Sequence, residues 1–285
     1  MTTTVTTITT MPITATRIIV TAIIRASAPS RTSMAPAAAT TITATRLTAT
    51  TTIMATPSAE VGDWRELPLF LWLSPAFPVG SFAYSHGLEW AVEAGDVVDA
   101  GSLSNWLADL AAFGAPRMDA ILFAAAHRAA EAADWRALNE INELAVALAG
   151  SAERRLETTA QGGAFRLAAR AAWDCEALAR VAEPGEAIAY PIAVAAAAAG
   201  HGMARQRATQ ALVVALFANL VSAAVRLSVV GQTDGQRVLA GILPDLGAMA
   251  REAASASLDD LGACAFRSDI AAMRHETQYS RLFRS

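Results

Sequence analysis

Residues 102–116 read Ser-Leu-Ser-Asn-Trp-Leu-Ala-Asp-Leu-Ala-Ala-Phe-Gly-Ala-Pro, and the spacing of the apolar side chains in this stretch decides the fold class. Ser102 is the predicted N-cap, because its hydroxyl can accept a hydrogen bond from a free backbone N–H. Gly114 and Pro116 predict the end of the helix. Large apolar residues return every three or four positions, which is the spacing of one face of an α-helix: Leu103, Trp106, Leu107, Leu110 and Phe113.

The same spacing recurs further along the chain. Residues 138–148 repeat it after Asp134, a predicted N-cap, and their helix is predicted to end at Gly150. Residues 212–221 carry a third apolar stripe, and Ser257 with Asp260 has the spacing of a capping box that opens the last helix. Runs that alternate apolar and polar residues, typical of half-buried strands, are scarce. The sequence therefore predicts an all-α fold, a single helical-bundle domain.

Two uncharged stretches have the composition of membrane spans. Residues 187–200 are short and contain Pro191, whereas residues 208–225 are uncharged over nearly the length that crosses a bilayer. The longer stretch also contains Gln210 and Asn219 and many small Ala residues, and the central helix of a bundle is apolar on all sides. We interpret it as a buried core helix and expect no membrane association.

Residues 1–62 form a low-complexity extension dominated by Thr and Ala. Such a segment has too few large apolar groups to offset the entropy of ordering, so disorder is predicted. Its acid-poor, Arg-bearing start superficially resembles a transit peptide or a weak signal peptide, but the favoured interpretation is an incidental extension. Residues 63–285 are predicted to form the helical domain, with residues 274–285 as a tail.

The formal net charge of −4 is unevenly distributed. The first 59 residues contain four Arg and no acid, which leaves a net charge of −8 on the remainder. An acidic body lacks the basic surface that binds nucleic acid and is repelled by anionic lipid. Only Cys175 and Cys264 are present, which indicates a reducing compartment. We therefore expect a cytoplasmic protein that does not bind nucleic acid.

Catalytic motifs are weak in this sequence. Residues 83–87, Ala-Tyr-Ser-His-Gly, approach a nucleophile elbow around Ser85, but Ala83 stands where that motif needs Gly, and no strand precedes it. A serine-dependent hydrolase using Ser85 is the alternative function. The four histidines show no metal-site spacing, and no phosphate-binding loop is evident. The sequence predicts a protein without catalytic activity.

Two internal segments interrupt the helical pattern. In residues 71–89, two prolines break an apolar helix into a loop that carries Phe77, Phe82 and Tyr84. These aromatic side chains either fill the end of the bundle or form a docking edge for a partner. In residues 226–236, Gln232 and Gln236 flank an Asp-Gly pair typical of a tight junction between helices. Their polar side chains either satisfy free helix ends or bind a partner.

The C-terminal tail is locally basic and rich in apolar groups. Its last twelve residues contain three Arg and one Glu, and they also contain Tyr279, Leu282 and Phe283. Arg and Tyr are enriched among residues that dominate protein interfaces. One interpretation is a tail that becomes ordered on a partner. The alternative is a tail folded onto its own bundle.

Taken together, these segments resemble the UreF family of urease accessory proteins. The resemblance rests on residues 74–82 and 84–89, on Glu157 with Gln161-Gly162, on residues 231–232 with 234–236, and on residues 275–276 with 279–285. These motifs occur in the right order over about residues 67–285. The sequence departs from the family pattern at Ser81, Ala83 and Tyr190, which affects local detail.

The resemblance implies an all-helical, dimeric protein that promotes nickel insertion into apo-urease. It implies binding to a UreD-type accessory protein (also called UreH) and to a UreG-type GTPase. Nickel and GTP would be used by the wider complex, and none is expected in a site on this chain. The residues expected to bind partners lie in the tail and in the two internal segments: His275, Glu276, Tyr279, Ser280, Arg281, Leu282, Phe283, Arg284, Ser285, Phe77, Phe82, Tyr84, Gln232 and Gln236.

Overall fold

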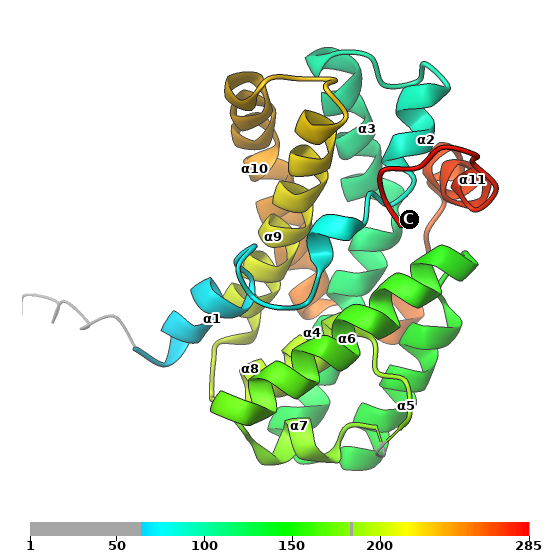
Figure 1. Cartoon of the computed structure of the whole chain (residues 1–285). Coiled ribbons are helices and arrows are strands. Elements are labelled where there is room, and N and C mark those ends of the chain that lie inside the picture. The colour runs from blue at the N-terminus through cyan, green and yellow to red at the C-terminus, as the bar shows by residue number, and fades with distance from the viewer. Residues whose placement is uncertain (1–63, 183–184, 285) are drawn as a thin grey trace, which may run out of the picture. The chain divides into compact units, whose positions relative to one another are not determined.

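A computed structural model describes residues 64–182 and 185–284, and within them the fold is all-α, as predicted, with no strand (Figure 1). All of these residues belong to one compact unit. The predicted extension, residues 1–62, lies outside the described residues. The α-helices are α1 (Leu67–Trp72), α2 (Leu88–Glu93), α3 (Ala100–Phe113), α4 (Ala115–Glu131), α5 (Trp135–Ala147), α6 (Ala152–Ala172), α7 (Glu176–Arg180), α8 (Tyr190–Gly200), α9 (Arg205–Arg226), α10 (Gln232–Ser255) and α11 (Phe266–His275).

The predicted helix at residues 103–113 is α3, but its N-cap is Asp99 and not Ser102. The Asp99 carboxylate accepts a hydrogen bond from the Ser102 backbone N–H at 2.8 Å, and the Ser102 hydroxyl accepts one from the Asp99 N–H at 3.0 Å. Ser102 is therefore the third helical residue of a reciprocal capping box. The predicted stop is confirmed, because α3 ends at Phe113 and Pro116 lies in the first turn of α4.

The predictions for two other helix ends are only partly confirmed. Asp134 caps α5 by accepting a hydrogen bond from the Ala137 N–H at 3.0 Å, but the helix ends at Ala147, before the predicted Gly150. Ser257 and Asp260 do form a capping box. That box caps the start of a single 3-10 turn, Leu258–Asp260, and not the start of the last helix. The last helix, α11, begins later, at Phe266.

The corner between α9 and α10 also differs from the sequence prediction. The chain turns at residues 227–231, where Ser228 has a φ of 60°, and α10 begins at Gln232. The Asp-Gly pair expected in the turn is thus helical. Asp234 lies in the first turn of α10, where the partial positive charge of the helix N-terminus stabilises a carboxylate.

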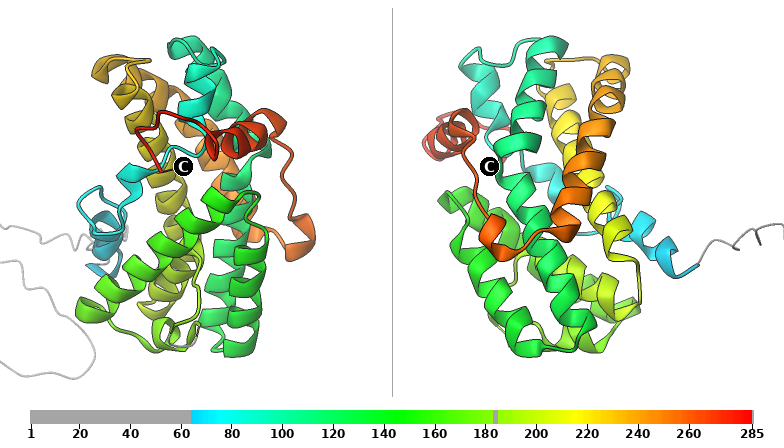
Figure 2. Two further views of the ribbon diagram at one scale, coloured as in Figure 1. Left: turned by 45° about the vertical axis from the view of Figure 1, so that its right-hand side comes forward. Right: turned by 180° about the vertical axis from the view of Figure 1, so that it is seen from behind.

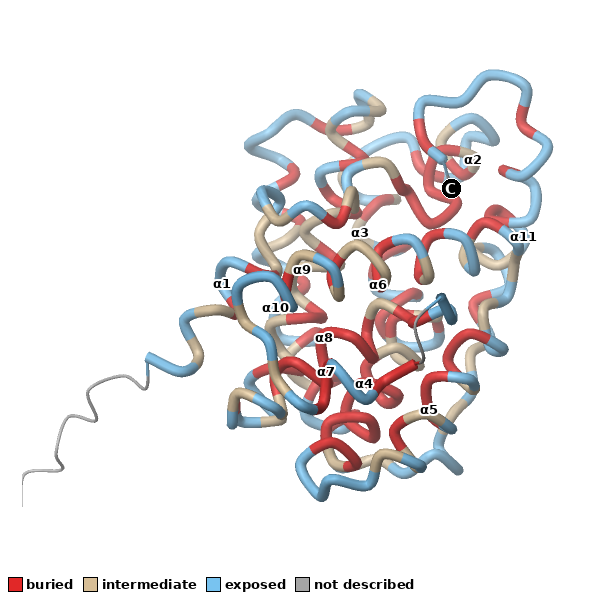
Figure 3. The backbone as a smooth tube through the Cα atoms, turned by 60° about the horizontal axis from the view of Figure 1, so that its bottom comes forward, coloured by how far each residue is buried: buried red, intermediate tan, exposed pale blue. Residues whose placement is uncertain are grey.

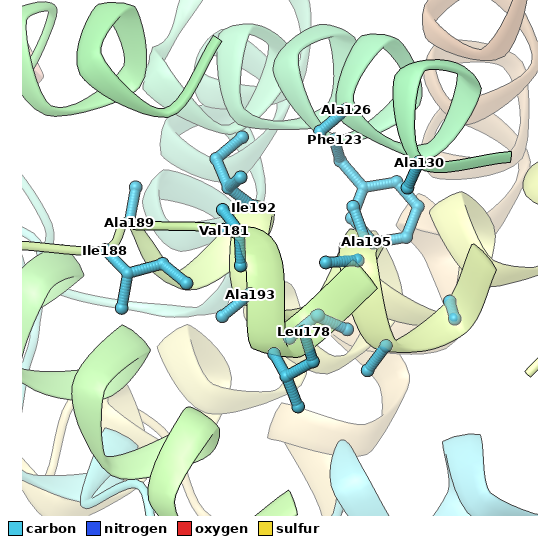
Figure 4. Close-up of a cluster of buried hydrophobic side chains, with 14 of the residues drawn as sticks. Phe123, Ala126, Ala130, Leu178, Val181, Ile188, Ala189, Ile192, Ala193 and Ala195 are labelled. Carbon is cyan, nitrogen blue, oxygen red and sulfur yellow. The ribbon is translucent and has the colours of Figure 1, made fainter. Parts of the chain in front are cut away.

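One half of the bundle is built around α8, which lies between α4 and α6 (Figure 1). Pro191 stands in its first turn, where a missing N–H costs nothing, so it starts the helix and does not interrupt it. Most of α8 is buried (Figure 3). Figure 4 shows its small side chains Ala193 and Ala195 beside Phe123 of α4 and Leu178 of α7. The small side chains allow close approach of the neighbouring helices.

The α6–α8 contact is especially close at Gly162. A Cβ atom added to Gly162 would lie 2.0 Å from the Ile188 carbonyl oxygen and 2.9 Å from two further backbone carbon atoms. Real Cβ atoms do not approach backbone this closely, so only glycine fits. The glycine quoted in the middle motif therefore sets the distance between α6 and the segment that leads into α8.

The other half of the bundle contains α9, which packs along α10 and α4. By length and composition, α9 is the one helix among the described residues that could cross a membrane. Half of its most apolar window is buried, and Phe217 and Leu220 are wholly enclosed. The central helix of a bundle meets the same criteria, so this single helix is only weak evidence for a membrane span.

Candidate partner-binding surface

The predicted tail, residues 274–285, begins inside α11, and its residues 276–284 follow that helix and lie against their own bundle (Figures 1 and 2). We call residues 276–284 the tail. The segment before α11 crosses the α3–α4 junction, where the Cys264 N–H donates to the Phe113 carbonyl at 2.8 Å. α11 then packs on the start of α2. There Gly87 has a φ of 77°, and a Cβ at this position would lie 2.6 Å from the Ala272 backbone nitrogen. Gly87 therefore permits α11 to approach, which brings the tail to α2.

The last residue of α11, His275, lies between two buried carboxylates. Its Nε2 atom is 3.0 Å from Glu89 of α2, and its Nδ1 atom is 2.7 Å from Glu153 of α6. The His275 side chain is completely buried. Each of the two carboxylates thus lies within hydrogen-bond distance of one ring nitrogen of His275. We call Glu89, Glu153 and His275 the tail anchor.

The tail anchor also binds the residues that follow His275. The two oxygens of Glu89 accept hydrogen bonds from the Leu282 and Phe283 backbone N–H groups, at 2.6 and 2.9 Å. Glu153 accepts one from the Arg281 guanidinium at 2.9 Å. Hydrogen bonds to charged groups are roughly twice as strong as neutral ones. Two buried carboxylates therefore fix a segment that has no regular secondary structure.

Phe283 is the apolar anchor of the tail. Its side chain is only 4% exposed and packs in the core half that contains α9. The guanidinium carbon of Arg226, at the end of α9, lies 4.3 Å from the centre of the Phe283 ring, within the range of a cation–π contact. The next residue, Arg284, donates its backbone N–H to the Ala83 carbonyl at 2.7 Å. The end of the tail thus joins the 3-10 turn Ser81–Ala83.

Three large apolar side chains of this region face solvent. Tyr279 is fully exposed, Leu282 is 63% exposed and Phe82, in the turn that Arg284 contacts, is 64% exposed. We call these three residues the tail surface. Exposed apolar side chains can mark interaction sites, and these three belong to the segments whose composition suggested partner binding, so the tail surface is a candidate for contact with a partner.

Several of the expected partner contacts are buried within the chain itself. Tyr84 is buried, and Phe77 is half-buried and packs against Phe165 with ring centres 5.4 Å apart. These two aromatic residues fill the bundle, whereas Phe82 remains exposed. His275 and Phe283 are likewise enclosed by their own chain, because the tail is already ordered without a partner.

The remaining expected contacts keep at least part of their surface. Glu276 and Ser280 are exposed, although the Glu276 carboxylate also accepts the Ala152 N–H at 2.9 Å. Arg281 is 40% exposed beyond its ion pair, and Arg284 is exposed. Ser285 lies outside the described residues. Gln232 and Gln236 are exposed on the first turn of α10.

Ser85 does not have the position of a nucleophile. It is completely buried, and its hydroxyl accepts the Glu89 backbone N–H at 3.3 Å at the start of α2. Beside it, the His86 ring contacts Arg154 and Glu157. The hydroxyl therefore has a structural role at a helix start, and the hydrolase interpretation is not supported.

A second buried charge cluster lies next to the tail anchor. Arg154 donates to Glu157 at 2.7 Å and to Asp119 at 3.1 Å, and His86 contacts Glu157 at 2.8 Å. Burial by itself would raise the pKa of Glu157, but the charges of His86 and Arg154 outweigh it and hold that pKa at about 2. Burial raises the pKa of Asp119 despite the neighbouring Arg154. This cluster joins the α2 loop to α4 and α6.

Among the described residues, no group of three or more His, Cys, Asp or Glu side chains has the geometry of a metal site. The charge cluster borders an open cavity of about 380 Å³ next to α11, whose wall is largely apolar.

Comparison with known proteins identifies the family. A family profile described as UreF matches residues 97–243. The urease accessory protein UreF of Xanthobacter autotrophicus is 56% identical over 221 residues, which cover 77% of this chain and 90% of that protein. The chain belongs to the UreF family. UreF proteins of Methylobacterium radiotolerans and Methylorubrum populi are 55% and 54% identical, over 96% and 98% of their own lengths.

The motifs that suggested the UreF family meet in space. His86 of the first motif contacts Glu157 of the middle motif, and Glu89 of the first motif contacts His275 of the last. Sequence analysis assigned no role to Glu89 or Glu153, although Glu89 ends a quoted motif. A carboxylate in the first turn of a helix is usually solvated, so its burial is visible only once the tail is placed.

Proposed function

We propose that this UreF-family chain is an assembly factor that promotes nickel insertion into apo-urease by binding other proteins. It contacts a UreD-type accessory protein through the tail surface and recruits a UreG-type GTPase to the resulting complex. Family membership supports a urease accessory role. The observation that supports the contact site is the exposure of Tyr279 and Leu282 on a tail bound by Glu89, and of Phe82 in the turn that Arg284 contacts.

Exposed aromatic and aliphatic side chains on a rigid support are efficient interface residues. Their burial against a partner removes apolar surface from water, which contributes roughly 2 kcal/mol of binding free energy for each large side chain. Because the tail is already ordered, little conformational entropy is lost on binding. Arg284 adds a positive charge beside these side chains, which favours a partner with an acidic and apolar contact face.

Further parts of the proposal follow from the family. The chain acts as a homodimer in the cytoplasm and carries neither catalytic activity nor a resident cofactor. Nickel and GTP are handled by the other components of the assembly. Gln232 and Gln236, exposed at the start of α10, are secondary candidates for partner contact.

Deleting residues 277–285 from the full chain is expected to abolish co-purification with the UreD-type protein, because the deletion removes Tyr279 and Leu282. The measurement is the yield of UreD-type protein recovered on the tagged chain, compared with the intact chain at equal expression. Circular dichroism must show that the shortened chain is still helical. Undiminished recovery by a folded, shortened chain would show that the tail is not the contact.

The same shortened chain tests whether UreG recruitment depends on the tail. We expect recovery of the UreG-type GTPase to fall together with that of the UreD-type protein, since the docked tail contributes to the surface that receives the GTPase. A shortened chain that is still dimeric and recovers the GTPase normally would contradict this coupling.

A further inference from the structure

The tail surface depends on contacts that are themselves hidden from any partner. Residues 276–284 contain no helix or strand, and the N–H groups of Leu282, Phe283 and Arg284 donate to distant parts of the chain. Glu89 accepts two of these hydrogen bonds, from Leu282 and Phe283. These two residues include one exposed side chain and one buried side chain. Glu89 therefore binds the N–H groups on both sides of the Leu282 Cα atom, which fixes the orientation of Leu282.

The two carboxylates of the tail anchor are buried beside the tail. Glu89 and Glu153 are each 7% exposed, and two carboxylates so far removed from water require partners. His275 lies between them, and Arg281 neutralises the second. Arg281 belongs to the tail, whereas His275 ends α11. Release of the tail would leave Glu153 without Arg281 and Glu89 without the Leu282 and Phe283 N–H groups, which favours the docked conformation.

We propose that Glu89, Glu153 and His275 are positioning residues for partner binding. They fix Tyr279 and Leu282 in the arrangement that the UreD-type partner recognises, and they act from beneath the tail without contacting the partner. The identity of the partner rests on the proposed function, whereas the conformation of the free tail does not. The two parts are therefore separable by experiment.

The conformation of the tail is measured by amide hydrogen exchange on the full chain in the absence of partners. Both oxygens of Glu89 accept hydrogen bonds, so Glu89→Gln replaces one acceptor with a donor and removes the charge. We expect the Leu282 and Phe283 amides to exchange at least about tenfold faster in this variant, with the amide of buried Phe217 in α9 unchanged. Glu140→Gln is the matched control, because Glu140 is an exposed carboxylate of α5.

The second measurement is the affinity of the same variants for the UreD-type protein. We expect Glu89→Gln to weaken binding at least about fivefold and Glu140→Gln to leave it unchanged. Unchanged exchange of Leu282 and Phe283 overturns the anchoring role. Faster exchange with unchanged affinity overturns the claim that the docked tail is the form the partner binds.

Arg281→Gln provides a second variant if Glu89→Gln does not fold. It removes the Arg281–Glu153 ion pair at a side chain that is 40% exposed, so the core is not disturbed. Only the exchange criterion applies to it, because Arg281 is also one of the expected partner contacts. If the unaltered chain binds no UreD-type protein, the proposed function and the choice of partner are both wrong. The hydrogen-exchange measurement still tests the anchoring role in that case, because it is made without a partner.

Discussion

Replacing Gly162 with Ala is expected to lower the free energy of unfolding by about 3 kcal/mol, because overpacking at backbone forces two elements apart. The added Cβ would lie 2.0 Å from the Ile188 carbonyl oxygen. That oxygen belongs to the backbone entering α8 and cannot move aside as a flexible side chain can. Urea unfolding followed by circular dichroism measures the loss.

Gly163 provides the matched control for this substitution. It is the next residue of α6, and a Cβ at Gly163 would have no neighbouring atom within 4 Å. Gly163→Ala is therefore expected to raise the free energy of unfolding by up to about 1 kcal/mol, the gain in helix propensity. Equal effects of the two substitutions would show that α6 and α8 are not in close contact at Gly162.

Replacing Arg154 with Met is expected to cost about 3–5 kcal/mol at pH 7, because it leaves buried carboxylates without their cation. Arg154 contacts both Glu157 and Asp119, at 2.7 and 3.1 Å. Met has a similar length, so the loss comes mainly from charge and hydrogen bonds. The neighbouring Arg155, which is exposed, provides the control: Arg155→Met is expected to change stability by less than about 0.5 kcal/mol.

The cost of Arg154→Met is also expected to depend on pH. In the unaltered chain the pKa of Glu157 is lowered from 4.5 to about 2, so its stabilising contribution is present above pH 4.5 and is lost as the pH falls toward 2. Without Arg154, burial moves the pKa of Glu157 upward, and protonation then relieves the cost of a buried charge. The difference between the two proteins should shrink between pH 7 and pH 3.5.

Urea unfolding of both proteins at these two pH values measures this dependence. A difference in free energy of unfolding that is equal at pH 7 and pH 3.5 would contradict the assignment of Glu157 as the buried ionised group. A difference that grows on acidification would contradict it more strongly, because the sign would be reversed.

Periodicity predicted the helices well because burial of one apolar face is a local property of the sequence. The apolar residues from Leu103 to Phe113 share one face only if the segment is helical, so α3 was predicted without knowledge of its neighbours. Helix starts were predicted less well, since several polar residues near a start can accept the same N–H groups. Asp99, and not Ser102, caps α3 for this reason, and both side chains take part in the capping box.

The partner-binding surface was predicted only in outline. The composition of the tail identified a segment rich in interface residues, but it did not distinguish inward from outward side chains. Phe283 and Leu282 are adjacent and similarly apolar, yet one is 4% and the other 63% exposed. The choice depends on Glu89, nearly two hundred residues earlier in the chain, and no local pattern contains that contact.

The most direct test of the proposed function is the affinity of the full chain for its UreD-type partner after Tyr279→Ser and Leu282→Ser are combined. Both side chains are exposed, so the fold should be unaffected. Leu167→Ser, at a side chain of α6 that is 78% exposed, is the control. We predict at least about 30-fold weaker binding for the double variant, equivalent to a loss of at least about 2 kcal/mol, and unchanged binding for the control. Equal affinities of the double variant and the unaltered chain would contradict a partner contact at the tail surface.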